Sequence, residues 1–163
     1  TPLTTFRTKL PSLSMAESMF RACPHLKYID TCLPNLTFAQ GMFGLCINLQ
    51  RVDLSKNSGI SLYNADDMFA GCQSLTHCML DLSYLETGEN MFGKSEINET
   101  TTINGITLTA GTTYNNSMLD LESVKFMCET IKDWSNPFTI DGTTINTAAH
   151  KITFGINQTE DHY

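Results

Sequence analysis

Apolar residues recur along the first hundred positions of the chain with a period of 23, far longer than the period of a single helix or strand. The most regular feature is a Met-Phe pair followed by a Cys and a Leu, as in MFGLCINL (42–49). The pairs begin at residues 19, 42, 68 and 91, so their spacings are 23, 26 and 23. A period in this range is typical of a protein built from similar units that stack.

The longer spacing of 26 marks an insertion of three residues after the second pair. The segment SKNSG (55–59) lies there, and its Ser, Asn and Gly favour a turn or loop. The repeat resumes in register beyond it, so we expect a loop and not a broken unit. Because residues 1–10 already match the middle of a unit, we also expect that the chain begins partway through one, as a fragment or a mature form.

Part of each unit is predicted to be a short strand. The segments LQRVDL (49–54) and LTHCML (75–80) carry apolar residues at their first, fourth and sixth positions. This pattern favours a strand whose apolar residues point into a core and whose other residues point out.

The part of each unit that leads through the Met-Phe pair is predicted to be one or two turns of helix. Ser or Thr stands three residues before Glu or Gln in the first two units, which is the spacing of a capping box. The candidate caps are Ser14 with Glu17, Thr37 with Gln40, and, one residue further on, Asn64 and Thr87. No unit of this size buries its own apolar side, so neighbouring units are expected to share a core.

Beyond residue 98 the pattern changes. TTINGITLT (101–109) places Asn-Gly between β-branched residues, which predicts a tight hairpin, and FTIDGTTI (138–145) predicts a second hairpin around Asp-Gly. A helix capped by Asp120 is predicted between them, and KITFGI (151–156) is predicted to be a strand. The helix is expected to present an apolar stripe of Leu121, Val124, Met127, Cys128, Ile131 and Trp134. We interpret this segment as a terminal cap over the last repeat; the alternative is a docking element for a further domain or subunit.

The pattern Met-Phe-x-x-Cys-x-x-Leu-x-x-hydrophobic resembles the BspA-type, or Treponema-type, leucine-rich repeats over residues 3 to about 98. Met19, Met42 and Met68 stand where that family more often has Ala. The resemblance implies an α/β fold, a curved leucine-rich-repeat solenoid with one short strand and one short helix per unit. We therefore expect repeats in residues 1–98, with a partial first unit, and an α+β C-terminal cap in residues 99–163.

The Cys of the repeat has several possible roles: a nucleophile, a metal ligand, half of a disulfide or a buried filler. Cys23, Cys46 and Cys72 share one repeat position, which Ser95 occupies in the fourth unit. A row of small buried side chains explains this best, since free Cys is among the most buried residue types. A disulfide between units stays open as the alternative. The other cysteines, Cys32, Cys78 and Cys128, lie at unrelated positions and form no zinc-binding spacing.

Composition and charge argue against several classes of function. The net charge is −7 and the ten Lys and Arg residues are scattered, which argues against a nucleic-acid partner. No apolar run is long enough to predict a membrane span. Phosphate-binding loops and the common hydrolase motifs are absent from the sequence. We expect no enzyme activity and no cofactor.

The strand pattern also predicts which residues face outward. If the apolar residues of 49–54 point inward, Arg51 and Asp53 point out, and stacking aligns Thr5, Tyr28, Arg51 and His77 in one row and Arg7, Asp30, Asp53 and Met79 in a second. In stacked repeats the sheet is the usual extended binding surface. The candidate ligand-binding residues are therefore Tyr28, Asp30, Arg51, Asp53, His77 and Met79. The alternative is a solvated strand face that binds nothing.

The resemblance implies a surface-exposed or secreted protein, often one that acts in adhesion. The first functional hypothesis is a recognition or adhesion module, extracellular or at the cell surface, that binds a protein or glycan. The second is a structural component of a virion appendage or surface fibre, in which the repeats act as a spacer or docking platform for neighbouring domains or subunits.

Overall fold

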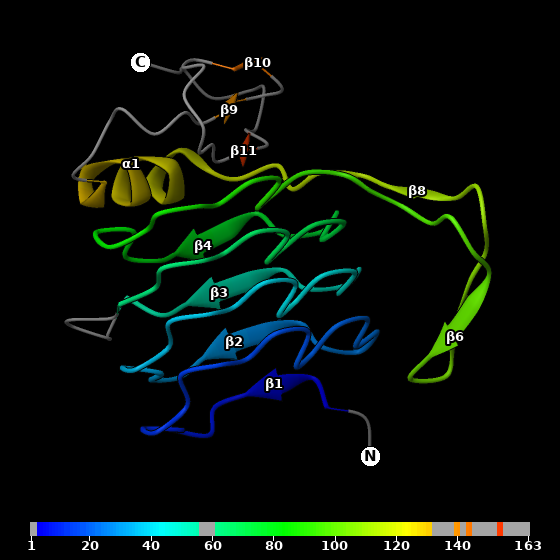
Figure 1. Cartoon of the computed structure of the whole chain (residues 1–163), viewed down its shortest axis with the longest axis horizontal. Coiled ribbons are helices and arrows are strands. Elements are labelled where there is room, and N and C mark those ends of the chain that lie inside the picture. Colours follow the sequence, from blue (N-terminus) through cyan, green and yellow to red (C-terminus); the bar gives the residue numbers. More distant parts are fainter. Residues whose placement is uncertain (1–2, 56–60, 132–138, 141–142, 145–152, 155–163) are drawn as a thin grey trace.

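The computed structural model describes residues 3–55, 61–131, 139–140, 143–144 and 153–154. Its centre is a parallel sheet of four short strands in chain order: β1 (Thr5–Phe6), β2 (Tyr28–Asp30), β3 (Arg51–Asp53) and β4 (His77–Met79). Each strand belongs to one coil of the chain, and the coils lie one above another (Figure 1). Phe6, Ile29, Val52 and Cys78 align across the sheet, which is the alignment that the repeat period predicts.

The prediction of a helix around each Met-Phe pair is wrong, because the chain forms a run of tight turns there. The N–H groups of Ala16, Ser18, Phe20 and Ala22 donate to the next coil, and those of Met19 and Arg21 donate within their own coil. The bond from Phe20 N to Met42 O is 2.8 Å, and that from Cys23 N to Phe20 O is 3.2 Å. The backbone of these turns is left-handed at several positions. The residues with positive φ in the turns are Ser18, Ala22, Gly41, Leu45, Asp67, Gly71 and Asn90.

The predicted capping residues belong instead to a second line of contacts between coils. Met15, Phe38, Asn64 and Thr87 form parallel β-bridges in sequence order. The carbonyl of Ser14 accepts from the N–H groups of Thr37 and Phe38, at 2.9 and 3.0 Å. These carbonyl and N–H groups therefore connect neighbouring coils and do not start helices.

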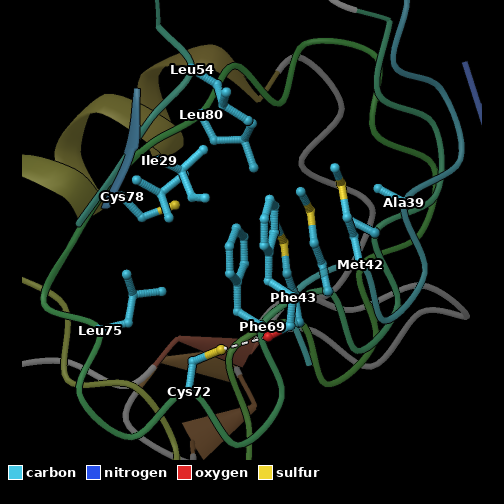
Figure 2. Close-up of a cluster of buried hydrophobic side chains, with 14 of the residues drawn as sticks. Ile29, Ala39, Met42, Phe43, Leu54, Phe69, Cys72, Leu75, Cys78 and Leu80 are labelled. Atoms are coloured by element: carbon cyan, nitrogen blue, oxygen red, sulfur yellow. Dashed lines mark hydrogen bonds between the residues drawn. The ribbon is translucent and has the colours of Figure 1, made fainter. Parts of the chain in front are cut away.

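Stacked aromatic rings run through the core beside the turns. The centroids of Phe20 and Phe43 are 5.5 Å apart, those of Phe43 and Phe69 are 5.5 Å apart, and those of Phe69 and Phe92 are 5.3 Å apart. The rings are nearly parallel within each pair, as Figure 2 shows for Phe43 and Phe69. Phe43 and Phe69 are fully buried and Phe20 is partly buried. These rings form part of the core that neighbouring units were expected to share.

A helix, α1 (Leu121–Thr130), lies against β4 at the end of the stack opposite β1 (Figure 1). Asp120 caps it, as predicted, by accepting from Ser123 N at 2.8 Å. Ser123 in turn accepts from the N–H of Cys78 at 2.8 Å, so a side chain of α1 satisfies a donor of β4. Val124 and Met127 complete the core shared by the coils.

Residues 94–116 form an arm that leaves the fourth coil and returns along the side of the stack (Figure 1). It contains β5 (Ser95–Glu96), which pairs with β8 (Thr113–Tyr114), and the predicted hairpin of β6 (Thr101–Ile103) and β7 (Ile106–Leu108). A second apolar cluster joins the arm to the coils through Ala22, Leu45, Ile97 and Leu108. At its tip, Asn104 Nδ2 donates to the carbonyl of Arg21 at 3.3 Å.

The last described strands are β9 (Thr139–Ile140), β10 (Thr143–Thr144) and β11 (Thr153–Phe154). β9 pairs antiparallel with β10 and parallel with β11. These pairings confirm the strands of the predicted second hairpin and part of the predicted final strand. Three parts of the predictions lie outside the described residues: the turn of that hairpin, residues 56–59 of the loop predicted at 55–59, and Trp134.

Replacing Phe43 by Ala tests the ring stack. Phe43 contacts a ring on each side, so its loss leaves a cavity between two coils, and Phe→Ala in a core costs ~3–5 kcal/mol. Because a domain is stable by only ~5–15 kcal/mol, the unfolding midpoint in urea should fall strongly. Tyr84→Ala, at an exposed tyrosine outside the sheet, is the control. An unchanged midpoint for Phe43→Ala would show that the rings do not support the stack.

Replacing Gly71 by Ala tests the contact of the arm with the third coil. A Cβ there would lie 2.9 Å from Leu45 Cδ2, 3.0 Å from Ser95 Cβ and 3.2 Å from Tyr114 Cβ. Gly105 is the matched control, since its φ is also positive but nothing lies within 4 Å of its Cβ position. Left-handed strain costs both variants ~1–2 kcal/mol. Gly71→Ala should therefore lower the free energy of unfolding clearly more than Gly105→Ala; equal losses would mean that the arm does not pack as described.

Candidate binding face

Four of the predicted ligand-binding residues form a compact group on the side of the sheet that faces away from the core. In β2 and β3 the middle residue is buried and its neighbours point the opposite way. Tyr28 pairs with Arg51 in register, and Asp30 pairs with Asp53. Tyr28 and Arg51 are exposed, while Asp30 and Asp53 are half-buried. We call this group, together with Arg7, the outer face.

The outer face holds a cavity of about 200 Å³. Its lining consists of Arg7, Tyr28, Ile29, Asp30, Arg51 and Asp53. The sequence places Arg7 one period before Asp30, although it was not among the predicted ligand-binding residues. The structure therefore brings four of the six predicted residues together around one hollow and adds an arginine to them.

The charges of the outer face balance, because it carries two arginines and two aspartates. Oδ1 of Asp53 accepts from the backbone N–H of Ser55 at 3.0 Å and from its hydroxyl at 2.6 Å. This turn holds the Asp53 carboxylate in one orientation at the end of β3. The face thus presents donors, acceptors and an aromatic ring without a net charge.

The outer face ends at β4, where His77 is buried and not exposed as the strand pattern predicted. Only 7% of His77 is exposed, because α1 begins beside it. Its Nδ1 lies 2.9 Å from Asp120 Oδ2 and 3.5 Å from Ser123 Oγ. His77 therefore takes part in packing the helix, and Met79 beside it is half-buried.

The contact with His77 also affects Asp120. Burial raises the pKa of Asp120, but hydrogen bonds from Ser123 and His77 outweigh this and hold the pKa below its ordinary value of 3.8. Because an ionised carboxylate only accepts hydrogen bonds, His77 donates through Nδ1. Ionised Asp120 stabilises the folded state above pH 3.8, and this contribution is lost as the pH falls through its lower folded-state pKa.

A second cavity, of about 220 Å³, lies where the tip of the arm meets the first coil. Its lining consists of Leu3, Cys23, Pro24, His25 and Asn104. Sequence reasoning did not find this cavity, since Asn104 is 81 residues from Cys23 and no periodic signal relates the two.

Comparison with known proteins settles the family. Residues 13–140 match the BspA type leucine rich repeat region in six copies. The chain belongs to this family. No curated protein and no solved structure matches the chain. The match extends past residue 98, where the repeats were expected to end, so that boundary stays a prediction.

BspA-type leucine-rich repeat domains are typically surface protein-interaction modules and generally non-catalytic. Their proteins are usually surface-associated or secreted. In this BspA-type chain the parallel sheet and the buried leucines fit a leucine-rich repeat fold.

In the cysteine row of these BspA-type repeats, Cys46 and Cys72 are buried, as predicted, whereas Cys23 of the first coil is half-buried. Cys46 Sγ donates to the carbonyl of Phe20 at 3.1 Å, and Cys72 Sγ donates to that of Phe43 at 3.0 Å (Figure 2). Burial raises the pKa of the Cys46 thiol to about 12 and raises that of Cys72 well above its ordinary value. Both thiols stay protonated at neutral pH, which suits packing and not nucleophilic chemistry.

The described part of the chain shows neither a candidate metal site nor a helix that could span a membrane. No group of three or more His, Cys, Asp or Glu residues there has a geometry that could hold a metal ion. Among the described helices, none is long and apolar enough to cross a membrane.

Thiol accessibility should follow this burial. In the native protein a thiol-reactive dye should not label the buried Cys46, Cys72 and Cys78, and should label the half-buried Cys23, Cys32 and Cys128 slowly. After denaturation under non-reducing conditions all six cysteines should react. Labelling counted by mass spectrometry tests this, and a denatured protein with six cysteines locked in disulfides would contradict it.

Proposed function

We propose that this chain is a non-catalytic recognition module of an extracellular or cell-surface protein and that its outer face binds a protein or glycan. The main support is the pairing of Tyr28 with Arg51 in register on the exposed side of the sheet. Tyr and Arg are enriched among residues that dominate binding energy. A sheet backed by a packed core holds such side chains more rigidly than a loop does. An adhesion role is the natural use of such a module.

We also propose that the chain is a solenoid in residues 1–98, closed by an α+β cap in residues 99–163. Two observations support a cap at this end. α1 satisfies a donor of β4 through Ser123, and it supplies Val124 and Met127 to the core of the coils. Without them the last coil would expose apolar surface, which a terminal cap normally prevents.

A structural role in a virion appendage or surface fibre is the second candidate. It is favoured by the exposed apolar residues of the first coil, since Leu3, Met15 and Met19 are 46%, 65% and 45% exposed. An apolar end of this kind suits contact with a neighbouring domain or subunit. In that arrangement the coils would serve as a spacer or docking platform.

Substitution on the outer face tests the recognition hypothesis. Tyr28→Ala and Arg51→Ala should each weaken binding about tenfold or more, as expected of residues that dominate binding, while the melting temperature stays nearly unchanged because both side chains are exposed. The measurement is biolayer interferometry on a panel of immobilised secreted glycoproteins, each presented with and without its glycans.

Tyr84→Ala is the matched control, since Tyr84 is an exposed tyrosine in no strand. It should leave binding unchanged. Binding that survives both outer-face substitutions but is lost when the surface of α1 is altered would place the site on the C-terminal segment instead.

A further inference from the structure

The outer face, if it is the binding surface proposed above, has a definite size. Its side chains come from β2, from β3 and from Arg7, which directly follows β1, and α1 ends it at β4. Adjacent strands lie about 4.8 Å apart and alternate residues of one strand about 6.6 Å apart. At these spacings the face covers on the order of 150 Å², whereas a protein partner usually covers about 800 Å². The face is too small to account for a stable protein interface.

The cavity at its centre is also small. At about 200 Å³ it lies below the range of ~300–1,000 Å³ that is usual for drug-sized ligands. Tyr28, Arg51, Asp30 and Asp53 stand at the corners of a patch about 5 by 7 Å. This matches one ring-sized group bound flat against the sheet.

The side chains at the corners suit a group that carries several hydroxyls. The ring of Tyr28 offers an apolar surface with a negative π face to C–H groups. The carboxylates of Asp30 and Asp53 accept hydrogen bonds from hydroxyl groups, and the guanidinium of Arg51 donates to them. The outer face therefore offers an aromatic surface to the C–H groups of a pyranose ring and both acceptors and donors to its hydroxyls.

The balance of charge on the outer face favours an uncharged ligand over an anionic or cationic one. Two arginines and two aspartates cancel, so an anionic group that approaches the arginines also meets the aspartates, and a cationic group meets the reverse. From this size, chemistry and charge we infer that the cavity of the outer face is a subsite for one uncharged sugar residue of a glycan.

Ligand-observed NMR with the intact chain tests this subsite. The probes are the methyl glycosides of glucose, galactose, mannose and N-acetylglucosamine, with glucuronate and protonated glucosamine as charged counterparts. At least one neutral glycoside should bind in the millimolar range that a single small group reaches, and more tightly than either charged sugar. Tyr28→Ala should weaken this binding about tenfold, and Tyr84→Ala should not change it.

Removing the two carboxylates tests the role of charge. The double variant Asp30→Asn/Asp53→Asn keeps the shape of the side chains but leaves the arginines unbalanced. It should lose its preference for the neutral glycoside and bind glucuronate about tenfold more tightly than the natural chain does. Melting temperatures measured by circular dichroism show that each variant is folded.

Three outcomes would overturn the sugar subsite. In the first, the natural chain binds no neutral glycoside even at concentrations well above millimolar, and in the second it binds a charged sugar more tightly than every neutral glycoside. The third is that Tyr28→Ala leaves the binding unchanged. The proposed function is judged separately. If Tyr28→Ala still abolishes capture of glycoproteins whose glycans were removed, the outer face recognises protein, and the sugar subsite is wrong while the recognition function stands. If no outer-face substitution changes any binding, both are wrong.

Discussion

Hydrogen bonds between coils hold this chain together, and the turn around each Met-Phe pair makes them possible. In the first three of these turns alternate N–H groups donate to the next coil, and most of those between donate within their own coil. Buried backbone donors must be satisfied, and this alternation satisfies them without a helix or a long strand. It also sets the coils close enough for the phenylalanine rings to stack at 5.3 to 5.5 Å. The strands, the ring stack and the outer face all depend on that spacing.

The sequence predicts the sheet and most of the outer face because both follow the repeat period. Ile29 and Val52 align inward, and Tyr28 aligns with Arg51, for the same reason that Met42 follows Met19 by 23 residues. The helix was mispredicted because Ser or Thr three residues before Glu or Gln resembles a capping box. A contrary signal was present: Gly41, Asp67 and Asn90 share one repeat position, and all three tolerate left-handed backbone better than most residues.

Contacts between the repeat and the segments outside it could not be predicted from the sequence. His77 occupies an outward position of the strand pattern, but α1 covers it through Asp120 and Ser123, which lie more than 40 residues away. The arm shows the same limit. Its hairpin was predicted from Asn104 and Gly105, yet nothing local indicates that the hairpin returns to the first coil. Periodicity determines what stacks within the repeat, whereas the position of a unique segment depends on surfaces that exist only after folding.

The hydrogen bond from Asn104 to the carbonyl of Arg21 also bears on the order of folding. Gly44, Ala70 and Gly93 occupy the equivalent position in the later coils, and each of their carbonyls accepts a backbone N–H from the coil before it. In the first coil an amide 83 residues away in sequence takes that place. Coil-to-coil contacts span about 23 residues, so they can form early and successively, while the arm closes a far longer loop at a greater entropic cost. During synthesis, the carbonyl of Arg21 is therefore expected to gain this hydrogen bond only after the arm has left the ribosome.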